Sequence, residues 1–158
     1  MSAEEVMSAE LRKSTSKSPR HRARELALQG IYQWRITSGD CAKIEKQICA
    51  EKNLGRYDKE LFSKLLGGTL GRHRELEAVL APHLDRPLEE LSPVEYSVLL
   101  LGAFELSQHL SVPYKVVINE AVELAKTFGG TDGHKFVNGV LDKLAPRLRA
   151  AEFSAHSS

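Results

Sequence analysis

Apolar residues recur at intervals of three and four along most of the chain, which is the spacing of one face of an α-helix. No segment alternates apolar and polar residues over a strand length, and no Asn-Gly turn joins two β-branched runs. The pattern therefore predicts an all-α fold. The first helix is expected to begin at Ser18, a favourable N-cap followed by Pro19, and to end in the polar segment 37–40.

Two further helices are predicted in the N-terminal half. One spans about residues 41–51, with Ile44 and Ile48 one turn apart, and another begins near Tyr57. The second of these has four residues at core spacing, Leu61, Phe62, Leu65 and Leu66. Glycines at 67, 68 and 71 weaken it, because each interior glycine costs about 1 kcal/mol relative to alanine. A kink or break is expected before Leu76.

The segment 81–93, APHLDRPLEELSP, is predicted to be an irregular connector, because prolines interrupt it. We place there the boundary between an N-terminal half, 18–84, and a C-terminal half, 88–150. Ser92 and Glu95 form a capping-box pattern that opens the next helix. That helix is apolar nearly all round, so it should be the central element of its half. A narrow strip of it is polar or small: Glu95, Gly102, Glu105 and His109.

Two more helices complete an expected bundle of about seven. One begins at Tyr114 and ends at Gly129, and the last is capped by Thr131 or Asp132. The apolar stripe of the last helix consists of Val137, Val140, Leu141 and Leu144. Phe136 lies at the margin of this stripe beside Lys135. On periodicity alone, its ring is either core packing or an exposed platform for a partner.

The first predicted helix carries apolar residues on two faces. One face consists of Ala23, Leu26, Ala27, Gly30 and Trp34, and a roughly opposite one consists of Leu28, Tyr32 and Ile36. Either the chain itself covers both faces, or the second face binds a partner protein, for which tyrosine is a common anchor.

The net charge of the 158-residue chain is +1, which predicts no overall attraction to nucleic acid or to an anionic membrane. Basic residues nevertheless gather between positions 12 and 24, where no acid occurs: Arg12, Lys13, Lys17, Arg20, Arg22 and Arg24. Such a cluster is either a solubilising tail or a phosphate-binding surface. Arginines at a helix N-terminus oppose the helix dipole, which favours a functional reason for them.

Catalysis finds little support in the sequence. The six histidines are dispersed, none is spaced as a metal ligand with cysteine or carboxylate, and no glycine-rich phosphate loop follows a strand. We expect no enzyme activity, no cofactor and no metal, and reduced structural thiols at Cys41 and Cys49. Residues 1–17 lack the apolar core of a signal peptide, so we expect a disordered arm and a cytoplasmic protein, with a flexible tail at 151–158.

Three segments resemble the NusB family of bacterial transcription antitermination factors: SPRHRARELALQGIYQW, LEELSPVEYSVL and PYKVVINEAVELAKTFGGTDGHKFVNGVLDKLAP. The resemblance covers about residues 18–149. It implies two helical bundles packed side by side and a non-enzymatic, RNA-binding adaptor. Members pair with the small-subunit ribosomal protein that serves as NusE, and the pair binds boxA RNA of ribosomal RNA operons. With NusA, NusG and RNA polymerase, the pair supports antitermination.

The resemblance also implies functional residues. The basic start of the family matches Arg20, Arg22 and Arg24, with His21 where another arginine is common. RNA-binding positions near the other end match Lys115, Asp132, Lys135 and Phe136, and positions that face NusE match Tyr32 and Glu95. In this interpretation, basic groups hold phosphates and Phe136 stacks an unpaired base of the single-stranded RNA.

Two alternative classes remain. One is the NusB-like RNA-binding module of RNA cytosine methyltransferases, although 158 residues leave no room for the methyltransferase domain itself. The other is a structural helical homodimer, in which the second apolar face of the first helix is covered by a second copy. Monomer and homodimer both fit the sequence.

Overall fold

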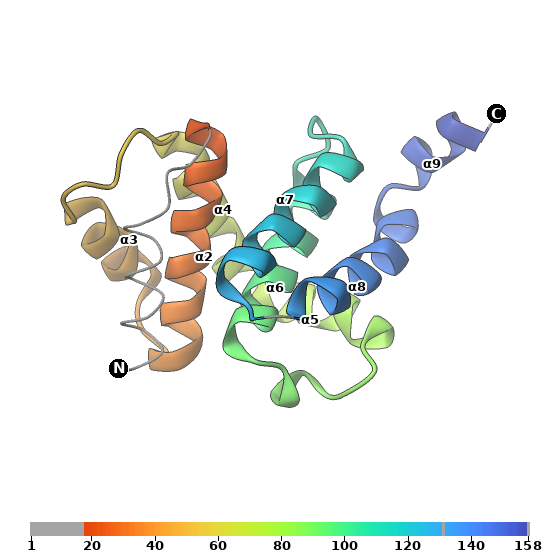
Figure 1. The fold of residues 1–158 in the computed structure, drawn as a ribbon, viewed down its shortest axis with the longest axis horizontal. Coiled ribbons are helices and arrows are strands. Elements are labelled where there is room, and N and C mark those ends of the chain that lie inside the picture. The colour runs from red at the N-terminus through yellow and green to blue at the C-terminus, as the bar shows by residue number, and fades with distance from the viewer. Residues whose placement is uncertain (1–17, 131, 158) are drawn as a thin grey trace. The chain divides into compact units, whose positions relative to one another are not determined.

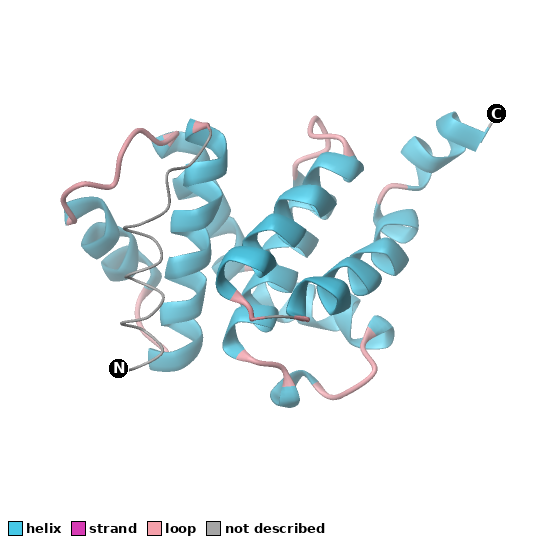
Figure 2. Ribbon diagram, in the orientation of Figure 1, coloured by secondary structure: helices cyan, strands magenta, loops and turns pink. Residues whose placement is uncertain are grey.

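The computed structural model describes residues 18–130 and 132–157, and all regular structure in these ranges is helical (Figures 1 and 2). The predicted all-α fold is confirmed. The chain divides into two compact units, unit 1 (Met1–Gly71) and unit 2 (Arg72–Ser158). The predicted disordered arm, 1–17, lies outside the described residues.

The described part of unit 1 contains three helices, α2 (Pro19–Thr37), α3 (Cys41–Ala50) and α4 (Lys59–Gly71). α2 packs against both of the others, and α3 also packs against α4. Gly30 allows α2 and α4 to approach closely, because a Cβ there would lie 2.7 Å from Leu66 Cδ1. The core of the unit is formed by Leu26, Ile31, Ile44, Ile48, Phe62, Leu65 and Leu66.

Both predicted ends of α2 are confirmed. The Ser18 hydroxyl oxygen accepts a hydrogen bond from the His21 N–H at 3.0 Å, and Pro19 occupies the first turn. At the other end, Ser38 adopts the left-handed conformation with φ 55°, and its N–H donates to the Trp34 carbonyl at 2.8 Å. The chain can therefore leave the helix before Gly39 and Asp40.

The glycine-rich segment of α4 breaks at its end. α4 continues to Gly71, and Arg72 then departs from helical geometry with φ −117° and ψ 17°. The predicted break before Leu76 is therefore present, and α5 (His73–Leu80) follows it. The chain passes from unit 1 to unit 2 at this break, earlier than the expected connector 81–93, because α5 packs against α6 and α8 of unit 2.

Helix α6 (Pro93–Gln108) is the centre of unit 2, as its all-round apolar pattern predicts. Every residue from Tyr96 to Leu106 is buried, and α5, α7 (Tyr114–Phe128) and α8 (Gly133–Leu148) all pack against it. Gly102 gives α8 room, because a Cβ there would lie 3.1 Å from Leu141 Cδ1. Most of the predicted polar strip of α6 is thus covered, and only its ends reach solvent.

The start of α6 and the end of α7 follow the predicted chemistry, whereas Asp132, the N-cap of α8, makes no side-chain cap hydrogen bond. Ser92 and Glu95 form both bonds of the capping box: the Glu95 N–H donates to Ser92 Oγ at 3.1 Å and the Ser92 N–H donates to Glu95 Oε1 at 3.2 Å. Gly129 ends α7, with its N–H on the Ala125 carbonyl at 2.8 Å. The left-handed residue is Gly130, with φ 77°. Between α5 and α6, the connector holds two short 3₁₀ helices, Ala81–His83 and Leu88–Glu90.

A helix, α9 (Ala150–Ser157), occupies the region where a flexible tail was expected. Its first turn is tied to the end of α6 through Arg149, which is buried. The Arg149 guanidinium donates to the carbonyls of Leu106 at 2.6 Å, Glu105 at 3.2 Å and His109 at 3.0 Å. These carbonyls belong to the C-terminal end of α6, where a cation is favourable.

The carboxylate of Glu152 completes this connection. It accepts a hydrogen bond from Arg149 Nη1 at 2.7 Å and another from the Tyr114 N–H at 3.0 Å. Tyr114 opens α7, whose N-cap Pro113 provides no side-chain cap, so Glu152 supplies an acceptor there. The rings of Tyr114 and Phe153 stack with their centroids 4.3 Å apart. Residues 149–153 therefore join the end of α6 to the start of α7.

We predict that Arg149→Met lowers the free energy of unfolding by about 3 kcal/mol, because three carbonyls and Glu152 each lose one hydrogen bond from a charged donor. Urea denaturation followed by circular dichroism measures this. Arg147→Met is the matched control, because Arg147 lies two residues earlier, in the last turn of α8, and is exposed; it should change stability by less than about 0.5 kcal/mol. Equal effects of the two substitutions would contradict this role of Arg149.

Candidate nucleic-acid and partner interface

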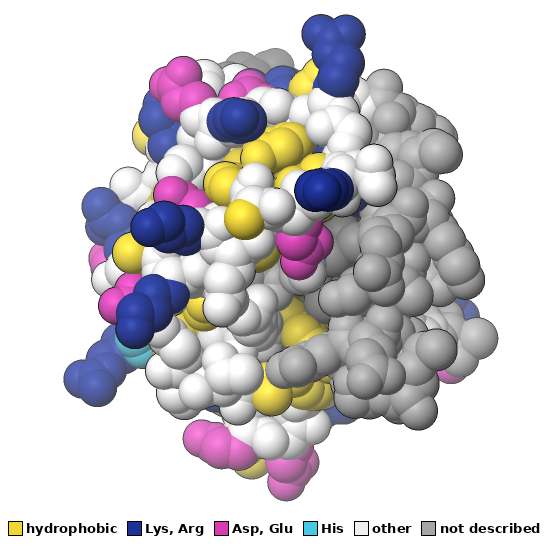
Figure 3. All heavy atoms as spheres, turned by 90° about the vertical axis from the view of Figure 1, so that its left-hand side faces the viewer, with side chains coloured by type: hydrophobic (Ala, Val, Ile, Leu, Met, Phe, Trp, Pro, Cys, Tyr) yellow, Lys and Arg dark blue, Asp and Glu magenta, His cyan; other side chains and the backbone are white. Residues whose placement is uncertain are grey.

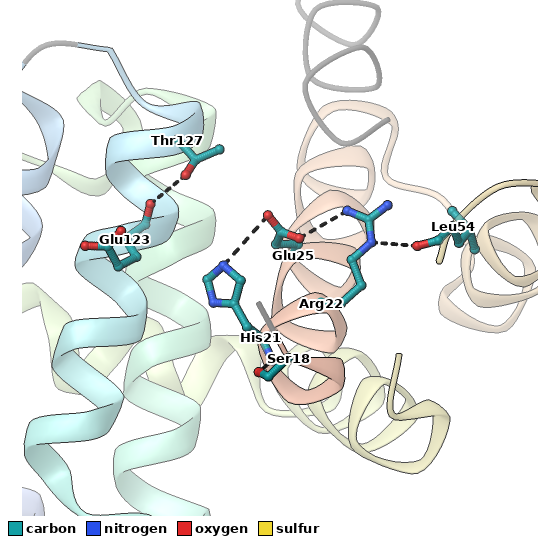
Figure 4. A network of polar contacts seen from close by, with 7 residues as sticks. All are labelled: Ser18, His21, Arg22, Glu25, Leu54, Glu123 and Thr127. Atoms are coloured by element: carbon teal, nitrogen blue, oxygen red, sulfur yellow. Dashed lines mark hydrogen bonds and ion pairs between the residues drawn. The ribbon is translucent and has the colours of Figure 1, made fainter. Parts of the chain in front are cut away.

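The three arginines at the start of α2 occupy different environments. Arg22 and Arg24 are each 3% exposed, whereas Arg20 is exposed. Arg22 Nε donates to the Leu54 carbonyl at 2.8 Å, and its Nη1 donates to Glu25 Oε1 at 3.1 Å, as Figure 4 shows. Arg22 therefore fastens the loop that follows α3 to the first turns of α2. Of the three, Arg20 presents its cation to solvent.

Glu25 is the acid that balances this cationic helix start. Its side chain is 1% exposed, and its second carboxylate oxygen lies 3.8 Å from His21 Nε2 (Figure 4). The loop is held further by the Asp58 N–H, which donates to the Pro19 carbonyl at 3.1 Å. Arg20 lies 3.9 Å from Asp58 Oδ2 in an exposed ion pair, which is a weak type of interaction. The unfavourable interaction of these cations with the helix dipole is thus offset within the unit.

The second apolar face of α2 is largely covered in this conformation. Leu28 is fully buried and Tyr32 is 4% exposed, whereas Ile36, one turn further on, is 45% exposed. Accessible apolar surface on this face is therefore found at the C-terminal end of the helix.

In unit 2, the start of α8 presents a charged surface around an aromatic ring. Asp132 precedes the helix, and Lys135 Nζ lies 3.7 Å from Asp132 Oδ1, with both side chains mostly exposed. Phe136 is half-buried, and the stripe of Val137, Val140, Leu141 and Leu144 is buried. The ring therefore lies at the margin of the core, where the helical periodicity places it.

Glu95 lies next to this surface. A Cβ built on Gly133 would be 3.9 Å from Glu95 Cγ, so the start of α6 and the start of α8 adjoin. The capping-box bond from the Ser92 N–H holds the Glu95 carboxylate, which is half-buried. A residue matched to partner binding thus lies beside residues matched to RNA binding.

The connector contributes an arginine that the sequence did not single out. Arg86 lies over the Phe136 ring, with its Cζ 4.5 Å from the ring centroid. Asp85 holds the same guanidinium, with Oδ1 2.8 Å from Nε and Oδ2 3.4 Å from Nη2. This hydrogen-bonded pair lowers the pKa of the Asp85 carboxyl and raises the pKa of Arg86, so both groups are charged at neutral pH. An Asp-Arg-Pro run in an irregular connector has no periodicity that would reveal this contact.

Lys115 lies apart from the other matched residues of unit 2. It is exposed on the first turn of α7, and from there to Phe128 the helix rises about 20 Å at 1.5 Å per residue. The structure therefore brings Glu95, Asp132, Lys135 and Phe136 together near the end of α7 and leaves Lys115 at its start. Arg20, Arg22, Arg24 and Tyr32 belong to unit 1.

Other kinds of site receive no support from the described residues. Figure 3 shows a face with several Lys and Arg side chains interspersed with acidic and hydrophobic ones. In residues 18–130 and 132–157, no three His, Cys, Asp or Glu side chains are grouped as a metal site requires. Cys41 and Cys49 are free thiols. None of the helices in these ranges combines the length and the apolar character that crossing a membrane demands.

The fold and this surface together define a small all-helical protein of two units, in which charged side chains surround a half-buried aromatic ring. The model of the NusB family matches residues 21–146. The chain belongs to the NusB family, as its sequence predicts.

Similar proteins support this assignment. The transcription antitermination protein NusB of Nitrosospira multiformis is 59% identical over 132 residues, which are 84% of each chain. The crystal structure of T. maritima NusB superposes with a TM-score of 0.77 at 29% identity, over 88% of this chain and 99% of that one. A crystal structure of the antitermination factors NusB and NusE in complex with double-stranded RNA matches with a TM-score of 0.73 at 28% identity, over 80% of this chain and 96% of the matched one.

We predict that Arg22→Met destabilises unit 1 by about 3 kcal/mol, because it removes the guanidinium that donates to the buried Glu25 carboxylate and to the Leu54 carbonyl. The loop should also loosen, which hydrogen–deuterium exchange measures as faster exchange of the amides of residues 54–58. Arg20→Met is the matched control, and it should change neither stability nor exchange appreciably. If Arg20→Met has the larger effect, the division of roles between these arginines is wrong.

Proposed function

We propose that the chain is a transcription antitermination factor that acts as an RNA-binding adaptor. Paired with the ribosomal protein NusE, it binds boxA RNA of ribosomal RNA operons, and with NusA, NusG and RNA polymerase it supports processive transcription. The observation that carries the proposal is membership of the NusB family, in which a solved relative forms a complex with NusE and RNA. The adaptor catalyses no reaction and acts in the cytoplasm.

The RNA-binding role is assigned to exposed side chains first. Arg20, Lys135 and Lys115 contact phosphates, for which an accessible cation is required. Asp132 accepts hydrogen bonds from base amino groups, and the margin position of Phe136 suits contact with an unpaired base. Arg22 and Arg24 act from buried positions, and Arg22 does so by holding the start of α2 on which Arg20 lies.

The contacts with NusE are assigned to Glu95 and to the second apolar face of α2. The Glu95 carboxylate is anchored and partly exposed, so it can accept hydrogen bonds without losing much conformational freedom. Tyr32 is 4% exposed, so NusE can contact it only if the side chain becomes more exposed. Ile36, on the same face, is already accessible. Ile36 therefore offers the accessible contact on this face, and Tyr32 contributes only when it is uncovered.

A binding assay with three RNAs tests the proposal. The purified chain and NusE are titrated against single-stranded boxA RNA, a scrambled single strand of equal length, and a duplex that contains boxA. The proposal expects the tightest binding to single-stranded boxA, since its bases are open to stacking and to hydrogen bonds. Equal affinity for boxA and the scrambled strand would reject it.

We predict that Phe136→Asp weakens binding to boxA by roughly 5- to 150-fold, since stacking on an aromatic side chain contributes about 1–3 kcal/mol per base. The melting temperature should hardly change, because the ring lies at the margin of the core. Val140→Asp is the contrasting variant: it places a charge in the core, where Val140 is buried, and should unfold the unit. A large loss of melting temperature for Phe136→Asp would instead assign the ring to core packing.

A further inference from the structure

We infer that Arg86 and Phe136 form one composite stacking surface, in which an unpaired RNA base lies against the outer face of the Arg86 guanidinium. The inference rests on the proposed RNA-binding function and adds a residue to its site. It also changes the role of Phe136, which then supports the arginine that meets the base.

Arg86 covers part of the Phe136 ring. Its Cζ lies over the Phe136 ring, 4.5 Å from the ring centroid, so the guanidinium covers that side of the ring. Phe136 is half-buried at the edge of the unit 2 core, so its ring has limited surface to offer a base. A base that approached the covered face of the ring would meet Arg86 first. Guanidinium planes stack on unpaired bases much as aromatic rings do.

Arg86 is held in place although it is on the surface. Its side chain is 38% exposed, and both carboxylate oxygens of Asp85 contact it, at Nε and at Nη2. A forked contact of this kind engages the edge of the guanidinium and leaves its faces open. Because the ring and Asp85 already order the side chain, a base can bind with a smaller loss of conformational entropy.

The charges around Arg86 favour a base over a phosphate as its ligand. The cation of Arg86 is paired with Asp85, and Glu90 and Glu95 also act on it electrostatically. These acids weaken the attraction of Arg86 for a phosphate, whereas stacking uses the face of the group and tolerates a paired charge. Lys135 is better suited to bind a phosphate, because it is mostly exposed and its Nζ lies near a single acid, 3.7 Å from Asp132 Oδ1.

The experiment measures the dissociation constant of the chain–NusE complex for single-stranded boxA RNA at several salt concentrations, with wild type, Arg86→Ala, Arg86→Lys and Lys135→Ala. Arg86→Ala should weaken binding at least about fivefold, and Arg86→Lys should not restore it, because lysine keeps the charge but not the plane. The salt dependence should stay as in wild type for both. Lys135→Ala should lower the slope of log K against log salt by about 0.7, as expected for one lost phosphate contact.

Three results would overturn the inference and leave the proposed function standing. Tighter binding by Arg86→Ala would mean that the arginine blocks the ring, and restoration by Arg86→Lys with a reduced salt slope in Arg86→Ala would make it a phosphate ligand. Unchanged binding by Arg86→Ala would remove it from the site, while the boxA preference of the wild type would still support the proposed function. Stacking tolerates any sequence, so if wild type shows no boxA preference, the same comparison on the scrambled strand decides the role of Arg86 separately. Absence of RNA binding by wild type would reject both.

Discussion

Helix α6 presents apolar side chains on all sides, and the other helices of unit 2 are arranged by the need to cover it. Its residues 96–106 are buried under α5, α7 and α8, and Gly102 lets α8 come close. Covering α6 places the start of α8 beside Glu95 and under Arg86 of the connector. The candidate RNA surface is therefore a consequence of how the core of this unit is closed.

The arginines near the start of α2 illustrate how one basic segment can serve folding and binding together. Arg22 is held in a buried network with Glu25 and the Leu54 carbonyl, and Arg20 extends into solvent. A buried cation that is satisfied by an acid and a carbonyl fixes local geometry but has little capacity left for a phosphate. Arg20, which is exposed, keeps that capacity. The buried arginine is therefore assigned to local structure and the exposed one to phosphate binding.

Much of the fold could be predicted from local chemistry. The cap at Ser18, the capping box at Ser92 and the central place of α6 follow from residue types and helical periodicity, and the structure confirms them. The position of Phe136 at the core margin was also predictable. Contacts between distant segments could not be predicted in this way. No periodic pattern predicts the burial of Arg22 or the contact of Arg86 with Phe136, because each depends on a loop folding back onto a helix. The same holds for Arg149 and Glu152, whose role depends on three helix ends meeting.

The central claim is that the surface at the start of α8, with Arg86 from the connector, contacts the RNA. Ultraviolet cross-linking of single-stranded boxA RNA to the full chain in complex with NusE, followed by tryptic digestion and mass spectrometry, tests it directly. The account predicts cross-links in the peptide that begins at Phe136 and in the peptide that contains Arg86. Cross-links confined to other parts of the chain, with both of these peptides unmodified, would contradict it.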